Sequence, residues 1–438
     1  MRKWLIGCGV LFGVVLVLCI GVLVWAFTPP KIEIPPRQLP PNNAYDEYRA
    51  MAEEMKQRLD ADTRFKQIES AIRGGQPLSA ADRAYYLQRM EPYLRRYELL
   101  TLRPCVVSVE RSVHARFPEF AQMRRIAWTE AYLMREELRQ KRYRAAVARA
   151  DRLSRLAEQA RNGGSLIHYL VGLAIHSIAL QPIREELPRI QDRAALEALL
   201  KLARDYEKRR IPLWKCIEEE YYTTLNIYYK LATGRLSAEQ LTDSPPDSSL
   251  EQIASRFGGV VDRYLAKDAI PEYRRIMTRF IEEFKQPFGK RPMRTEADIE
   301  KETRNPLNKT LLPVFAKVSE KEASEVAVMR LIGCAAAIRL HKLRTGNYPA
   351  SLEALRPELG EMIIDPFSGK PFVYRTDPRF GFLLYSVSLN GMDDGGATIY
   401  QGFPDVRGDL SPVKVPIPDH LKGTPPQQMP LVAPLWMR

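Results

Sequence analysis

Apolar residues recur with a helical period over most of the chain. From residue 43 to residue 286 they are spaced three and four positions apart, beginning with the series Tyr45, Tyr48, Met51, Ala52, Met55 and Leu59. Glycines and prolines interrupt the pattern at Gly74-Gly75, Gly163-Gly164, Pro188, Pro212 and Gly234, so we expect helices of ordinary length. The chain is therefore predicted to be mainly α, with a helical bundle or array domain over residues 43–286.

One segment inside this domain is apolar on every side. Leu166–Leu180 reads LIHYLVGLAIHSIAL, which is short for a membrane span and contains two histidines. A helix without a polar face is stable in water only when other helices surround it. We therefore expect this segment to be the central, buried helix of the domain.

The amino-terminal end carries a longer apolar run. Trp4–Phe27 contains no charged residue, and as a helix of roughly 36 Å it would cross a ~30 Å hydrocarbon core with some tilt. The alternatives are a cleaved signal peptide and a lipoprotein signal at Cys8, but the run is long for a signal core and no small-residue cleavage site follows it. The sequence favours an uncleaved transmembrane anchor over residues 1–27, with membrane contact through residues 4–27.

Charge sets the expected orientation of this anchor. Arg2 and Lys3 precede the run, which places the amino terminus in the cytoplasm, and Lys31 and Arg37 weaken this bias without reversing it. The bulk of the chain would then lie outside the bacterial cytoplasmic membrane. The net charge of +13 suits anionic partners, but the basic residues alternate with acidic ones along helices. Together with the expected location, this argues against nucleic acid as a partner.

Proline marks the segments that lack periodicity. Residues 28–42 contain six prolines and predict an extended, semi-rigid linker between the anchor and the helical domain. Residues 287–310 are polar and interrupted by proline, which predicts a second linker. Residues 409–438 are again rich in proline and predict a disordered tail.

A different pattern occupies residues 311–408. An apolar stripe runs from Val314 to Leu343, and Gly346 suits the left-handed position just past the end of a helix. Phe372–Thr376 and Phe380–Val387 are rich in β-formers and separated by a turn, which predicts a hairpin. This part is expected to be a small α+β domain made of one long helix and a short antiparallel sheet.

Residues 311–408 resemble the globular head of type II secretion major pseudopilins. The family pattern Gly-x-Tyr-Pro-x-x-Leu-x-x-Leu is matched by Gly346, Tyr348, Pro349, Leu352 and Leu355. A second family pattern, Asp-Pro-Trp-Gly-x-Pro-Tyr, is similar to the series Asp365, Pro366, Phe367, Gly369, Pro371 and Phe372, in which Ser368 is one additional residue. The resemblance implies the head fold and a docking role in secretion- or pilus-like machinery.

The chain also departs from that family. In a pseudopilin the hydrophobic helix carries a processing site and a Glu and continues directly into the head, whereas Trp4–Phe27 lies far upstream and has no Glu. Membership in a secretion pilus therefore conflicts with the position of the anchor. The expected architecture is a pseudopilin-like head on a helical membrane protein.

The resemblance further implies a calcium site in the Gly/Asp loop. Hard cations prefer carboxylate and carbonyl oxygens, and Asp393, Asp394, Leu389 (through its carbonyl) and Asp405 are the candidate ligands. Asn390 stands where the family has Asp, and the loop is one residue longer. A turn-rich loop without an ion is the alternative.

Known catalytic patterns are missing from the sequence. It has no HExxH, Gly-x-Ser-x-Gly or Walker motif, and His168 and His176 are expected to be satisfied core histidines. Outside the apolar run Cys105, Cys216 and Cys334 remain, an odd number that does not imply a disulfide framework. Buried free thiols are favoured over a Cys105–Cys216 bridge.

Two functions remain open. The first is a non-enzymatic interaction or scaffold protein of the bacterial envelope, with envelope proteins as partners. The alternative is an extracytoplasmic hydrolase or ligand-binding protein whose site lies in the helical domain, near His168, His176 and Tyr221-Tyr222. The alternative requires a deep polar pocket in that region. The sequence favours the first, because it contains no positive signal for catalysis.

Overall fold

The fold was analysed in a computed structural model. It describes residues 17, 20, 21, 24, 25, 27–241, 249–292, 294–313, 315–378, 381–399, 408–413 and 431–432. Most of the predicted anchor Trp4–Phe27, most of the predicted tail 409–438, and Asp405 lie outside the described residues. The described part is mainly helical, as predicted.

The first helices form one side of the body. They are α2 (Ala44–Leu59), α3 (Thr63–Arg73), α4 (Ala80–Leu100), α5 (Pro118–Arg139) and α6 (Tyr143–Arg161). Asn43, Asp62 and Ser79 cap the first three with side-chain oxygens, which accept otherwise unpaired backbone N–H groups.

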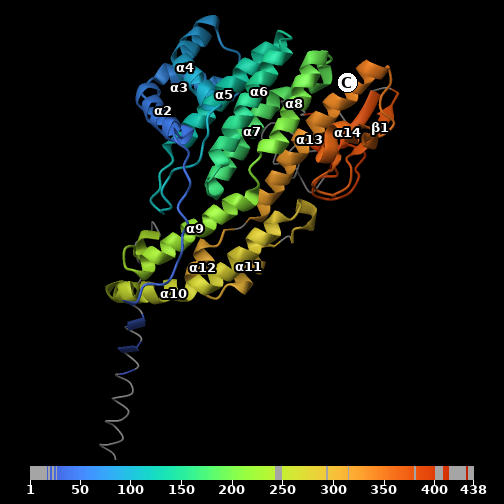
Figure 1. The fold of residues 1–438 in the computed structure, drawn as a ribbon. Coiled ribbons are helices and arrows are strands. Elements are labelled where there is room, and N and C mark those ends of the chain that lie inside the picture. Colours follow the sequence, from blue (N-terminus) through green and yellow to red (C-terminus); the bar gives the residue numbers. More distant parts are fainter. Residues whose placement is uncertain are drawn as a thin grey trace, which may run out of the picture.

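The apolar segment lies in the centre, as expected. Helix α7 spans Leu166–Glu186 and packs against α5, α6, α9 and α13. By length and composition Leu166–Arg189 would suffice to cross a membrane, but 67% of its most apolar stretch is buried inside the protein. Helix α8 (Arg193–Arg209) follows and packs on α6 and α13. Figure 1 shows α5, α6, α7, α8 and α13 side by side.

A second group of helices lies nearer the amino-terminal run (Figure 1). Helices α9 (Leu213–Ala232) and α10 (Ser249–Lys285) pack against each other, and α10 continues through Pro271 to a length of 37 residues, longer than the ordinary helices predicted. Residues 287–310 contain α11 (Glu296–Glu302) and the start of α12 (Pro306–Leu311). The segment predicted as a linker is thus packed, with Ile299 and Asn308 buried and the Tyr228 hydroxyl 2.5 Å from Asn308 Oδ1.

The carboxy-terminal part is a long helix followed by a hairpin. Helix α13 spans Ala316–Thr345 and ends at Gly346, whose φ of 79° is left-handed as predicted. After α14 (Arg356–Leu359), strands β1 (Val373–Asp377) and β2 (Gly381–Tyr385) pair antiparallel with Val373 opposite Tyr385. A further antiparallel pair joins β3 (Thr398–Ile399) to β4 (Leu431–Val432).

Short 3₁₀ turns connect several of these elements. They are η1 (Leu187–Arg189), η2 (Ala238–Leu241), η3 (Phe288–Lys290), η4 (Leu352–Leu355) and η5 (Gly360–Ile363). Helix α13 packs along α8 and α7, so one apolar core continues from α2 to β2. The predicted α+β part therefore shares its long helix with the helical part.

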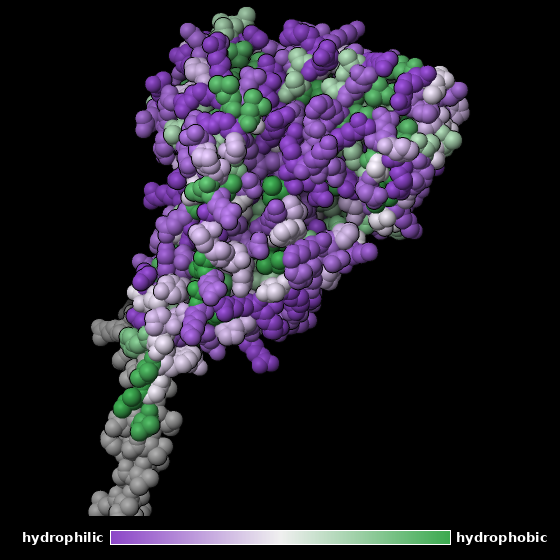
Figure 2. All heavy atoms as spheres, viewed as in Figure 1, coloured by the Kyte–Doolittle hydropathy of each residue, from purple (hydrophilic) through white to green (hydrophobic). Residues whose placement is uncertain are grey.

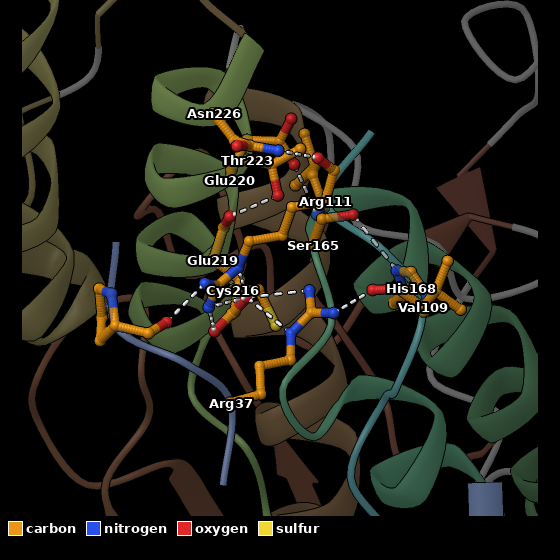
Figure 3. A network of polar contacts seen from close by, with 12 residues as sticks. Arg37, Val109, Arg111, Ser165, His168, Cys216, Glu219, Glu220, Thr223 and Asn226 are labelled. Carbon is orange, nitrogen blue, oxygen red and sulfur yellow. Dashed lines mark hydrogen bonds and ion pairs between the residues drawn. The ribbon is translucent and has the colours of Figure 1, made fainter. Parts of the chain in front are cut away.

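The proline-rich segment before α2 is extended, and side chains hold it against the body. Arg37 and Arg111 converge on the Glu219 carboxylate of α9, with N–O distances of 3.0 Å and 2.9 Å (Figure 3). Arg111 also donates to the Pro35 carbonyl at 2.7 Å, and Arg37 to that of Val109. Residues 28–42 are therefore a strap on the surface of the body.

Candidate functional site: a pocket between α7 and α13

A pocket of about 410 Å³ opens between α7 and α13. Its apolar walls are Leu170, Leu173, Ala174, Leu180 and Val328. Its polar groups are His176, Ser177, Arg184, Lys321, Ser324 and Glu325. This volume is within the range of small-molecule sites, and a mostly apolar lining with a few polar groups is typical of them.

A buried ionic cluster lies behind the pocket and reaches it through His176 and Glu325. The Arg161 side chain is fully buried, and its guanidinium donates to both Glu325 oxygens at 2.5 Å and 2.9 Å. Glu325 Oε1 also lies 2.6 Å from His176 Nδ1, and Oε2 accepts from the Tyr206 hydroxyl at 3.2 Å. Glu158 binds the same guanidinium at 3.1 Å and accepts from the Ile211 N–H. Four helices, α6, α7, α8 and α13, meet in this cluster.

The neighbouring charges decide the protonation of the cluster. Burial favours the neutral acid at Glu325, but Arg161 and His176 outweigh it and hold the pKa of this carboxyl well below its usual range. At Glu158 burial prevails over Arg161, and the pKa is raised. The two carboxyls share one guanidinium and differ in their other contacts, and their pKa values are shifted in opposite directions.

A glycine makes room for the cluster. A Cβ at Gly172 would lie 2.4 Å from Arg161 Nε and 2.7 Å from the Ala157 carbonyl, closer than real contacts allow. Gly172 is therefore required where α6 and α7 cross. The guanidinium also lies 4.7 Å from the centroid of the Tyr169 ring, which offers its π face to the cation.

Two nitrogens of the cluster, Arg161 Nε and His176 Nε2, lack a hydrogen-bond partner among the described residues. His176 Nε2 is buried, and no described residue is within hydrogen-bonding distance of it. The ring stacks on Tyr206, with centroids 5.0 Å apart and planes at 12°, so its orientation is fixed. The contact with the Glu325 carboxylate requires a proton on Nδ1, so this nitrogen donates the hydrogen bond. His176 Nε2 has almost no accessible surface, so it lies behind the pocket surface rather than on it.

The structure separates the residues that sequence reasoning grouped together. His168 pairs with Ser165 Oγ at 3.2 Å and packs edge-on against Phe117 and Phe120, away from His176. Burial, with Arg37 nearby, lowers the pKa of His168 to about 3. Tyr221 lies between Tyr222 and Tyr273, with ring centroids 5.2 Å and 6.0 Å away. Of the group, only His176 lines the pocket.

Sequence reasoning missed Arg161 and Glu325. Both are charged residues at positions that face other helices, and Glu322, three residues before Glu325, already stood among the apolar positions of the α13 stripe. Glu322 is buried too and binds Arg291 at 2.6 Å and the Leu213 N–H at 2.9 Å. The acidic residues on the buried side of α13 were thus the only sequence signal for this cluster that we can point to. They do not indicate which basic residues bind them.

The predicted calcium ligands are occupied by the loop itself. Asp393 Oδ1 accepts from the Tyr385 hydroxyl at 2.7 Å and from Gly395 N–H, and Asp394 Oδ2 accepts from Asn390 Nδ2. Asp405 lies outside the described residues. No cluster of three or more His, Cys, Asp or Glu suited to a metal occurs in the described part of the chain. Calcium binding with Asp393, Asp394, Leu389 and Asp405 stays a prediction.

Asp409 is an acid that sequence reasoning did not single out. It is buried beside this loop, accepts from Gly396 N–H at 2.7 Å, and leaves Oδ1 without a partner among the described residues. Burial raises its pKa to about 7, although the N–H contacts act in the opposite direction. Its contact is therefore with the same turn that carries Asp393 and Asp394.

Three cysteines lie in the described part of the chain. Cys105, Cys216 and Cys334 are buried free thiols, as predicted. Burial raises the pKa of Cys105 and Cys334 to about 12, so neither is a reactive thiolate.

No protein-family model, curated protein or solved structure matches this chain. The site is therefore interpreted from its own chemistry.

Proposed function

We propose that the protein is a non-enzymatic interaction protein of the bacterial envelope. It is held in the cytoplasmic membrane by residues 4–27, with its amino terminus in the cytoplasm, and the pocket between α7 and α13 receives an apolar side chain of a partner protein. The supporting observation is the composition of that pocket, which combines five apolar residues with a few polar ones, His176 and Glu325 among them. The pseudopilin-like head is part of this proposal as a further docking surface.

The position of the pocket favours docking of a protein. The pocket is open on one side, between a helix of the central bundle and the long helix that leads into β1 and β2. A protruding side chain can enter it without a rearrangement of either helix. The buried cluster behind it keeps α7 and α13 at a constant spacing, which lowers the entropic cost of binding.

A hydrolase is the second candidate, and one observation favours it. Glu325 and His176 form a carboxylate–imidazole pair at 2.6 Å with Nε2 as the basic end, as in a general base oriented by an acid. The described residues place no nucleophile on Nε2, and the Ser324 hydroxyl donates to the Glu320 carbonyl instead. The pair alone therefore supports binding better than covalent catalysis.

Site-specific photo-crosslinking tests the proposal. A photoreactive amino acid at Ser177, on the pocket wall, is expected to capture a defined envelope protein in intact cells. The same amino acid at Ile167, which is exposed on α7 outside the pocket, is the matched control. Ala174→Trp fills the pocket and should abolish the Ser177 crosslink. Equal capture from both positions, or capture that survives Ala174→Trp, would contradict the proposal.

The hydrolase alternative has its own readout. The purified chain is assayed with ester and amide substrates of increasing apolar size. Turnover that disappears in His176→Gln, whose folded state is verified by circular dichroism, would replace the interaction proposal. Turnover that persists in His176→Gln would exclude the Glu325–His176 pair as its source.

A further inference from the structure

Helix α10 contacts the end of the apolar amino-terminal run directly. The Tyr264 and Trp25 rings meet edge-on with centroids 5.4 Å apart, and the Arg263 guanidinium lies 4.6 Å from the Phe27 ring centroid. Lys267 Nζ donates to the carbonyls of Trp25 and Thr28. A cation at carbonyls that end a helical segment is electrostatically favourable, so α10 holds the run where it leaves the body.

The same part of α10 exposes apolar side chains. Three apolar side chains are exposed there: Val260 (36%), Val261 (45%) and Tyr264 (50%). Tyr264 lies four positions after Val260 and three after Val261, so it neighbours both on one side of the helix. In the amino-terminal segment that contacts α10, Trp25 and Phe27 are 45% and 53% exposed. Figure 2 shows the apolar residues of the run directly below the body, where α10 crosses it in Figure 1.

Charges beside this apolar strip are mostly positive. Arg263 and Lys267 lie on α10, and Lys31 is exposed on the strap, where Arg274 donates to its carbonyl at 3.2 Å. The acids nearby are Asp262, the exposed Asp268, which also accepts from Asn305 Nδ2, and the exposed Glu33 on the strap, so the positive excess is small. Exposed valines with Tyr and Trp, flanked by Arg and Lys, are the composition of segments that lie in a membrane interface.

We propose that residues 259–267 of α10, with Trp25 and Phe27, form a membrane-contact surface that binds anionic phospholipid headgroups. Val260, Val261 and Tyr264 enter the headgroup region, while the positive charges of Arg263 and Lys267, which are held by the protein beside them, attract the anionic headgroups. The inference rests on the proposed anchor, because the anchor brings this surface to the bilayer. The contact with Trp25 sets its depth, since Trp settles at the interface.

The test uses the full chain in lipid nanodiscs. Val261→Cys, in a chain with Cys8→Ser and Cys19→Ser, carries an environment-sensitive fluorophore, and quenching by headgroup nitroxide lipids reports contact. The matched label is Leu343→Cys, exposed near the end of α13, which lies far from the apolar run in Figure 1. The three remaining cysteines are buried and stay unlabelled.

We expect strong quenching at position 261 and none at position 343 when the discs contain phosphatidylglycerol. Arg263→Glu should weaken the dependence on phosphatidylglycerol by at least about fivefold, because one interfacial cation contributes a factor of that size and the new carboxylate repels anionic headgroups. Lys201→Glu, an exposed charge reversal on α8, should leave it unchanged.

Two failures are distinguishable. A chain that remains in the discs but shows equal quenching at positions 261 and 343 overturns the contact surface and leaves the anchor intact. A chain that does not co-elute with discs overturns the anchor itself. Quenching at position 261 that is the same in phosphatidylcholine discs overturns the selectivity for anionic headgroups.

Discussion

Glu325 Oε1 on α13 lies 2.6 Å from His176 Nδ1 on α7, although the two residues are 149 positions apart in the chain. The same carboxylate receives the buried Arg161 guanidinium of α6. A charge pair away from water is stable only while every member keeps its partner. The carboxy-terminal helix is therefore joined to the central bundle by charge as well as by apolar packing.

Removing the charge of Glu325 should destabilise the whole body. Glu325→Gln leaves Arg161 with Glu158 as its only carboxylate, and we expect the free energy of unfolding to fall by about 3 kcal/mol. Urea denaturation followed by circular dichroism measures this. The control is Glu353→Gln, which removes the exposed pair with Arg356 and should leave the stability nearly unchanged, because water screens that pair. Equal effects would show that the cluster does not stabilise the fold.

Two glycines in helices should respond to alanine with opposite signs. Gly172→Ala places a methyl group against Arg161 and the Ala157 carbonyl, so we expect a loss of about 2 kcal/mol. Gly259→Ala on α10 meets nothing within 4 Å and should stabilise the protein by about 0.5–1 kcal/mol through the helix preference of Ala. Thermal unfolding of both variants gives the comparison. A neutral Gly172→Ala would disprove the crowded crossing of α6 and α7.

Acid should weaken the fold through His168. Its pKa is about 3 in the folded state and about 6.5 in an unfolded chain, so below pH 6.5 only the unfolded state takes up the proton. The contribution of the neutral His168 ring to the free energy of unfolding is complete above pH 6.5 and is lost as pH falls toward 3. From pH 7 to pH 5 the loss should be about 2 kcal/mol. His168→Gln should lack this part of the slope in urea titrations, and an unchanged slope would contradict a buried neutral ring.

The strap should loosen when Glu219 loses its charge. Glu219→Gln leaves Arg37 and Arg111 close together without the carboxylate that joins them (Figure 3). We expect trypsin to cleave after Lys31 and Arg37 about tenfold faster, equivalent to about 1.4 kcal/mol of lost local stability. Glu218→Gln, one residue earlier and outside this ion pair, is the control. Equal cleavage of both variants would mean that apolar contacts alone hold the strap.

Much of the helical architecture follows from local patterns. The helix ends at Gly74-Gly75, Gly163-Gly164 and Gly234 and the left-handed Gly346 are consequences of backbone freedom, which sequence displays directly. The burial of α7 follows from its lack of a polar face. The β1–β2 hairpin was likewise predictable, from two β-rich runs and the turn between them.

The pocket and its cluster were not predictable. Arg161, His176 and Glu325 come from three helices, and nothing near any of them in the chain identifies the other two. The packed state of residues 287–310 was hidden for a similar reason, because Ile299 and Asn308 are buried by α9 and α10 rather than by neighbours in sequence. Polar composition predicts a linker only when no distant partner covers it.

The contacts between α10 and the end of the apolar run bear on how the body stands above a bilayer. A domain on a flexible tether tumbles and samples every direction, so a partner meets its binding site at random. Here the end of the proposed anchor is in contact with three side chains of α10, those of Arg263, Tyr264 and Lys267. The strap then continues to α9, where Arg37 pairs with Glu219. With the anchor embedded, the pocket would stay at a constant distance from the bilayer and in a constant orientation to it. A partner in the same membrane would then reach the pocket by lateral diffusion in two dimensions.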